Sequence, residues 1–150
     1  MIADIAEALM MIAALPGFKL LFSGSRPDDI GVEGGRLTAC PSSPNCVVSQ
    51  GEADAEHAIA PLRYSGTPAE AMDALRQVVE NQARSEIIEQ TDNYLYAEFT
   101  SKLMGFVDDV EFYFPADEPG VIHVRAAARL GQSDLGVNRK RIEAIRAALI

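Results

Sequence analysis

The stretch YLYAEFTSKLMGFVDDVEFYFPADEPGVIHVRAAARL, residues 94–130, determines the fold class of this chain. Residues 94–100, 106–114 and 121–130 are rich in the aromatic and β-branched residues that favour strands. Only short turns separate these segments, so the sequence predicts successive antiparallel strands. Residues 86–90 add a further strand before the turn at 91–93.

Alternation along these strands predicts two chemically different faces, because successive side chains point to opposite sides of a sheet. One face is apolar except for Asp108, with Leu95, Ala97, Phe99, Phe106, Val110, Phe112, Phe114, Ile122, Val124, Ala126, Ala128 and Leu130. The other face is polar and collects Tyr94, Tyr96, Glu98, Asp109, Glu111, Tyr113, His123, Arg125 and Arg129.

Two interpretations of the polar face follow. It is either a solvated surface with cross-strand ion pairs, each contributing roughly 0.2 to 1 kcal/mol, or a groove in which arginines bind a carboxylate or phosphate and an acid or histidine transfers protons. The buried Asp108 needs a partner in either case, and we expect Arg139, Arg141 or backbone amides to supply it. The candidate ligand-binding residues are Asn45, Asp109, Glu111, His123, Arg125, Arg129, Asp134, Asn138 and Arg139.

Two helices and a fifth short strand complete the predicted core. Thr67, Pro68 and Glu70 have the side chains of a helix start, and the helical period continues to about Ala83. Residues 136–149 predict a C-terminal helix capped near Ser133 or Asp134, and residues 59–64 a strand. A helix amino end beside strand arginines would be a ready anion site.

The expected fold class is α+β: a mainly antiparallel four- to five-stranded sheet with helices packed on one face. A curved sheet gripping the last helix or a flatter two-layer sandwich would satisfy this pattern. Residues 1–150 are predicted to form a single domain, in which an N-terminal helix (1–22) and a long Pro/Gly-rich arm (23–56) are appended to the core (57–150).

Residues 1–22 are apolar, but Asp4, Glu7 and Pro16-Gly17 argue against a signal peptide or a transmembrane segment. Helical spacing predicts an amphipathic helix that packs on its own domain or, alternatively, on a protein partner or membrane surface. The net charge of −9 argues against binding nucleic acid or anionic membranes. These features predict a cytoplasmic protein.

Cys40 and Cys46, the two cysteines of the chain, lie six residues apart in a loop with two prolines. They are either a disulfide, which needs an oxidising compartment, or a pair of reduced thiols. A zinc site would need two more ligands, and His57 and His123 are not at ligand-like spacing. We therefore predict no metal and no cofactor.

Three motifs together resemble a known family. They are CPSSPNCV at 40–47, GFVDDVEF at 105–112 and RAAARLGQSDLGVNR at 125–139, and the likeness runs from Phe22 to Leu149. They are similar to Domain of Unknown Function family 1499, whose sequences occur in bacteria, cyanobacteria and plant plastids and which implies no established activity. Where members read Arg-Ser-Ala-Ser-Arg, this chain has alanines at 126–128, which argues against a nucleophilic serine there.

The preferred functional hypothesis is a non-enzymatic domain that binds a small anionic or polar ligand or serves in assembly. One alternative is a small hydrolase or isomerase with Glu111 or His123 as general base. Another is a redox-responsive module that depends on Cys40 and Cys46.

Overall fold

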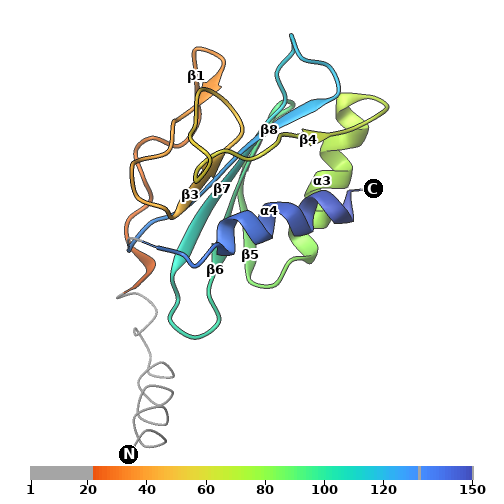
Figure 1. The fold of residues 1–150 in the computed structure, drawn as a ribbon. Coiled ribbons are helices and arrows are strands. Elements are labelled where there is room, and N and C mark those ends of the chain that lie inside the picture. The colour runs from red at the N-terminus through yellow and green to blue at the C-terminus, as the bar shows by residue number, and fades with distance from the viewer. Residues whose placement is uncertain (1–21, 132, 150) are drawn as a thin grey trace, which may run out of the picture.

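Six strands form one antiparallel sheet in the computed structural model, which describes residues 22–131 and 133–149 (Figure 1). The spatial order is β3-β8-β7-β6-β5, and β4 pairs with the other end of β8. The predicted meander is confirmed over the last four strands. The bounds in chain order are β3 Cys46–Val48, β4 Leu62–Arg63, β5 Ser85–Gln90, β6 Tyr94–Thr100, β7 Val107–Tyr113 and β8 Val121–Ala128.

The prediction of four to five strands was wrong because β3 lies inside the segment predicted as an irregular arm. Its three residues pair with β8, Val47 opposite Ala126, and all three are buried. A strand this short shows no alternation that a sequence pattern could reveal. The strand predicted at 59–64 is also shorter and is confined to β4.

The helix α3, Pro68–Asn81, begins as its sequence predicts. The Thr67 hydroxyl oxygen accepts a hydrogen bond from the Glu70 amide at 3.1 Å, and the Thr67 hydroxyl donates to the Glu70 carboxylate at 2.9 Å. These bonds satisfy an amide that the first turn of a helix leaves unpaired. The buried side of α3 consists of Ala71, Met72, Leu75 and Val79.

The second helix, α4 (Val137–Ala148), begins slightly later than predicted. Its N-cap residue is Gly136, which has a φ of 76°, a left-handed conformation that glycine adopts readily. Asp134 still has the predicted chemical role, since its carboxylate accepts from the amides of Gly136 and Asn138 at 2.9 and 3.1 Å. The side chain that accepts hydrogen bonds from the first amides of α4 is therefore Asp134, two residues before the N-cap residue Gly136.

Both helices pack on the apolar face of the sheet and form the main core with it (Figure 1). Leu95, Val110, Phe112, Ile122 and Val124 are fully buried there, so the predicted apolar face is confirmed in the middle of the strands. The prediction of a buried apolar face is wrong at the strand ends, where Phe106 and Leu130 are 37% and 40% exposed. Phe106 lies just before the start of β7 and Leu130 lies past the end of β8, so both are outside the paired strands.

The arm forms a third layer on the polar face. It contains a small hairpin of β1 (Val32–Glu33) and β2 (Arg36–Leu37) before it enters β3. Leu37 is 5% exposed and packs with Tyr94 and Tyr96 of β6. The sheet is thus covered on both faces, by helices on one and by the arm on the other (Figure 1).

The helix predicted over residues 1–22 lies almost entirely outside the described residues. Within 22–131 and 133–149, none of the helices has the length and apolar character that a membrane span requires.

Candidate functional site

The polar face holds a buried cluster of charged side chains, which we call the Asp109 cluster. Asp109 on β7 is 1% exposed. Arg129, just after β8, places Nε 2.9 Å from Oδ2 and Nη2 2.8 Å from Oδ1 of this carboxylate. The same Nη2 lies 2.6 Å from Oε1 of Glu98. The register places Glu98 opposite Asp109, so two carboxylates share one guanidinium.

Tyr96 and Arg26 complete the Asp109 cluster. The Tyr96 hydroxyl donates to Asp109 at 2.6 Å, and Arg26 of the arm lies 2.6 Å from Glu98. Burial alone would lower the pKa of Arg129, but its hydrogen bonds to Asp109 and Glu98 raise that pKa above its ordinary value. Burial alone would raise the pKa of Glu98, but the two arginines lower it. The protein therefore neutralises these charges internally.

A second buried pair lies beside this cluster, where Glu111 is opposite Arg125 in the β7–β8 register. Glu111 is fully buried and Arg125 is 4% exposed, yet the closest approach of their side chains is 3.7 Å. Glu111 Oε1 accepts from the Gly31 amide at 2.8 Å and the Tyr94 hydroxyl at 2.7 Å. Glu111 Oε2 and Arg125 Nε have no hydrogen-bond partner among the described residues.

Burial raises the pKa of Glu111 above its ordinary value, although the Gly31 amide, the Tyr94 hydroxyl and Arg125 all favour the ionised form. Arg125 also approaches Asp29 of the arm at 3.8 Å. The contacts of Glu111 and Arg125 therefore attach the arm to the sheet.

The interpretation of the polar face as a solvated surface was wrong, because the arm buries Asp109, Glu111, Arg125 and most of His123. The alternation did bring Asp109 together with Arg129, and Glu111 with Arg125. Both arginines, however, face carboxylates of the protein itself, so we place no external ligand between them.

Asn45 lies apart from these pairs, in the loop closed by a disulfide between Cys40 and Cys46. Its side-chain amide donates to the Gly131 carbonyl at 2.8 Å, and its own carbonyl accepts from the Asn138 side chain at 3.4 Å. Both asparagines are buried. These bonds attach the disulfide loop to the end of β8 and to α4.

His57 also holds this loop in place. One ring nitrogen, Nδ1, lies 2.7 Å from the Asp54 carboxylate, and the other, Nε2, lies 2.8 Å from the Ser43 carbonyl. The Ser43 carbonyl and the Asp54 carboxylate raise the pKa of His57. Two acceptors require two N–H donors, which indicates an imidazolium.

The ligand atoms of Asp54, Glu56 and His57 all lie within 4.8 Å of one another, which makes this the metal-like grouping found in the described part of the chain. Both His57 nitrogens already have hydrogen bonds, and the two acidic residues are exposed. The group is therefore better described as an anchor of the disulfide loop than as a metal centre.

The buried Asp108 has one of its predicted partners. Arg141 of α4 places Nη1 2.9 Å from its carboxylate, while the guanidinium lies 4.7 Å from the centre of the Phe99 ring. Burial raises the pKa of Asp108, and Arg141 opposes this shift. Arg139, the other predicted partner, donates instead to the Glu56 carbonyl at 3.0 Å. The ion pair between Asp108 and Arg141 therefore attaches α4 to the sheet.

The start of α4 does not combine with the strand arginines as predicted. Asp134 and Arg139 line a hollow of about 340 Å³ with Pro44 and Glu56, whereas Arg129 points to the Asp109 cluster on the polar face. The helix start and the strand arginines thus serve separate parts of the structure.

A polar pocket of about 370 Å³, which we call the His123 pocket, opens where the arm meets the turn between β7 and β8. His123 Nδ1 lies 3.0 Å from the Ser49 hydroxyl oxygen, and Nε2 lies 2.8 Å from the Glu118 carboxylate. The Ser49 oxygen also accepts from the Val124 amide at 2.8 Å. The lining consists of Gly34, Gly35, Arg36, Ser49, Gln50, Gly51, Tyr113, Asp117, Glu118 and His123.

Of the pocket residues, only His123 was predicted as a candidate. Ser49 lies 74 positions before it in the chain, and Glu118 belongs to the turn 115–120, which has no regular period. No sequence signal joins them, since only the β3–β8 pairing brings Ser49 beside β8. Arg36 has no ion pair with any residue in the described ranges, unlike Arg125 and Arg129.

The fold and these contacts define a class of protein: an α+β domain whose antiparallel sheet separates a helical layer from an arm that buries ionised side chains. Residues 36–149 match the sequence model described as "Protein of unknown function (DUF1499)", and the chain belongs to this family. The resemblance seen in the three motifs is thus confirmed. No curated protein matches the chain.

Proposed function

We propose that this domain binds a small polar ligand carrying an anionic group, and that the ligand occupies the His123 pocket. The observation that carries the proposal is Arg36, an exposed guanidinium in a polar hollow with no carboxylate partner within 22–131 and 133–149. A guanidinium binds carboxylate or phosphate through paired N–H donors. Tyr113 adds a hydroxyl, and Asp117 accepts from any ligand hydroxyl or amine. The ring nitrogens of His123 and the side-chain amide of Gln50 already form hydrogen bonds within the protein and serve to shape the pocket.

Thermal shift and isothermal titration with phosphate, sulfate and citrate test this proposal. We expect saturable binding that Arg36→Ala removes, because that substitution deletes the unpaired cation of the pocket. Arg63→Ala is the matched control, since Arg63 is also exposed but lies on β4, outside the pocket. Absence of binding at millimolar concentrations, or equal loss in both variants, would contradict the proposal.

A second candidate, a serine hydrolase, is favoured by the chain of contacts from Ser49 through His123 to Glu118. A neutral His123 would accept the Ser49 proton at Nδ1 and donate from Nε2 to Glu118, the order of roles that a catalytic triad needs. As Oγ attacked a carbonyl carbon, its proton would pass to Nδ1 and then to the leaving alcohol. The Val124 amide, which donates to Oγ, weakens this candidate because it occupies a lone pair of the nucleophile.

A fluorophosphonate probe separates the two candidates. Labelling of the wild-type chain at Ser49, seen by mass spectrometry and lost in Ser49→Ala but not in Ser42→Ala, would establish a reactive hydroxyl. Ser42 is an exposed serine of the disulfide loop and controls for general reactivity. An unlabelled Ser49 would reject the hydrolase and leave anion binding in place.

We also propose that the protein works in an oxidising compartment, in place of the cytoplasmic location expected at first. The bond between Cys40 and Cys46 supports this, because disulfides rarely persist in a reducing cytosol. Alkylation of the protein extracted without reductant checks the proposal. Two alkylated thiols would contradict it.

A further inference from the structure

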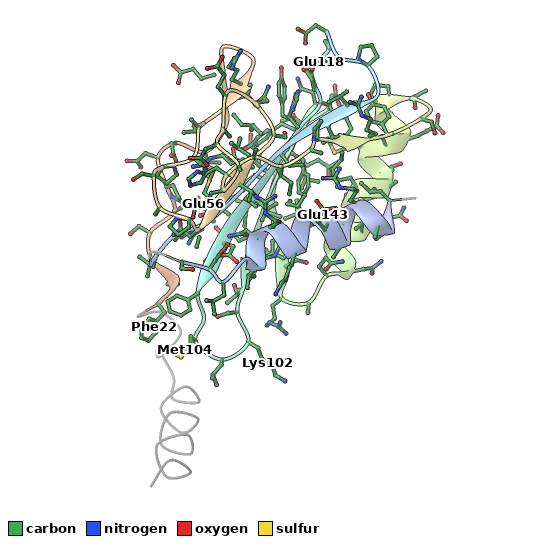
Figure 2. The ribbon with its side chains drawn as sticks, viewed as in Figure 1. Phe22, Glu56, Lys102, Met104, Glu118 and Glu143 are labelled. Carbon is green, nitrogen blue, oxygen red and sulfur yellow. A yellow bond between two sulfur atoms is a disulfide. The ribbon has the colours of Figure 1, made fainter. Side chains whose placement is uncertain are left out.

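The lining of the His123 pocket carries ionised side chains of opposite sign. Arg36 comes from the β1–β2 hairpin, while Asp117 and Glu118 come from the turn between β7 and β8. Figure 2 shows Glu118 on that turn, at the end of the molecule where Figure 1 places the hairpin. A site for a simple anion needs the cation but not the acidic side chains.

The backbone on both sides of Arg36 is held by one side chain, that of Gln50. The Gln50 amide nitrogen donates to the Gly35 carbonyl at 3.1 Å, and the Gln50 amide oxygen accepts from the Leu37 amide at 2.8 Å. The guanidinium of Arg36 is exposed and has no hydrogen bond or ion pair with any residue that the structure describes. The hairpin is therefore fixed, while the donors of the cation stay available to a ligand.

Asp117 is the carboxylate that remains available on the opposite side. His123 Nε2 lies 2.8 Å from Glu118 Oε2, so the charge of Glu118 is engaged within the protein. The exposed side chain of Asp117 has no such partner in the described part of the chain. Asp117 and Arg36 line the same pocket, yet no ion pair joins them. The pocket thus holds two separated and opposite charges.

A ligand with only an anionic group matches Arg36 but is repelled by Asp117. An ammonium on the same molecule turns this repulsion into attraction. Building on the anion-binding function proposed above, we propose that the ligand is a small zwitterion of the amino-acid class, whose carboxylate binds Arg36 and whose ammonium binds Asp117. One guanidinium balances the single charge of a carboxylate but not the nearly double charge of a phosphomonoester. The volume of about 370 Å³ suits a ligand of this size.

Isothermal titration with matched pairs of ligands tests the inference. The zwitterions are glycine, β-alanine, γ-aminobutyrate and ε-aminocaproate, which separate the two charges by increasing lengths. Each is compared with its N-acetyl derivative, which keeps the carboxylate but lacks the ammonium. We expect at least one zwitterion to bind the wild type about tenfold more tightly than its N-acetyl form, because only the zwitterion gains the ion pair with Asp117.

Variants assign the two charges separately. Asp117→Asn should remove the preference for the zwitterion and tighten the binding of citrate, because the repelling carboxylate is gone while Arg36 remains. Arg36→Ala should abolish the binding of zwitterions and citrate alike. Asp73→Asn is the matched control and should leave every affinity unchanged, since Asp73 is also an exposed aspartate but lies on α3, on the opposite face of the sheet.

The inference is overturned if every zwitterion binds no more tightly than its N-acetyl form, if the preference persists in Asp117→Asn, or if that variant binds citrate more weakly. In each case, citrate binding that depends on Arg36 would leave the anion-binding function in place. A wild type that binds neither citrate nor any zwitterion would overturn both proposals.

Discussion

Asp109 receives hydrogen bonds from Arg129 and Tyr96 while almost no solvent reaches it. A buried ion pair of this kind is not a large net source of stability, but removing one partner leaves the other charge without compensation. The Asp109 cluster therefore adds little to the net free energy of unfolding, but the folded structure must keep all of its charged partners together.

We expect Asp109→Asn to lower the free energy of unfolding by about 3 kcal/mol, because Arg129 would keep only Glu98 as a carboxylate partner. Urea denaturation measures this difference. Glu143→Gln is the control, since Glu143 is 53% exposed in its pair with Arg146, and such pairs contribute about 1 kcal/mol at most. Equal losses in the two variants would show that burial has no role.

Glu111 should make stability depend on pH. Its pKa is raised in the folded protein above the ordinary value of 4.5, so the folded state keeps this proton to a higher pH than the unfolded chain does. The stability that protonation contributes is complete below the unfolded pKa and is lost as the pH rises through the folded pKa.

Glu111→Gln removes this titration and preserves the shape of the side chain. We expect the stability of the variant relative to the wild type to rise as the pH increases from about 4.5 through the raised pKa of the folded state. Urea unfolding at several pH values gives the comparison, with Glu33→Gln on the exposed strand β1 as control. Parallel curves for Glu111→Gln and wild type would contradict the raised pKa.

The element that the disulfide loop supports is β3. This strand is three residues long and begins at Cys46 itself, so the disulfide, Asn45 and His57 all hold it from one side. Short strands gain little from their own ladder of hydrogen bonds. The pairing of β3 with β8 therefore depends on the loop that precedes it.

Replacing the disulfide by Cys40→Ser with Cys46→Ala should lower the free energy of unfolding by about 2 kcal/mol, the chain-entropy expectation for so short a closed loop. Hydrogen exchange should also speed up in β3 before it does in β7. Reductant should lower the stability of the wild type and leave the variant unchanged. A wild type that is indifferent to reductant would contradict this role.

At the scale of the whole molecule, the arm gives the sheet a second covering layer, on the face that the helices do not cover. Arg26 of the arm contacts Glu98 across 72 positions of the chain, and Gly31 contacts Glu111 across 80. Leu37 packs against the tyrosines of β6. An antiparallel sheet often leaves one face in water, but here the arm covers it.

Leu37→Ala tests whether the arm is an integral layer. Leu37 is 5% exposed, and we expect a loss of about 2 to 3 kcal/mol in the free energy of global unfolding. Val32→Ala, at a residue of the same hairpin that is 37% exposed, should change it by less than about 0.5 kcal/mol. If the arm were a detachable cover, Leu37→Ala would speed exchange of arm amides without moving the global transition.

The sequence by itself determined the meander of β5 to β8, the two faces of that sheet and the start of α3, because alternation and capping act between residues a few positions apart. The same alternation placed Asp109 and Arg129 on one face, and the structure joins them in an ion pair. Family membership also followed from local motifs.

Only the tertiary structure decided that the polar face is buried, that β3 joins the sheet, and that Ser49 and Glu118 meet His123. The reason is physical. These contacts join segments with no shared period, and their partners are chosen by how the arm packs over the sheet, which no local pattern of residues expresses.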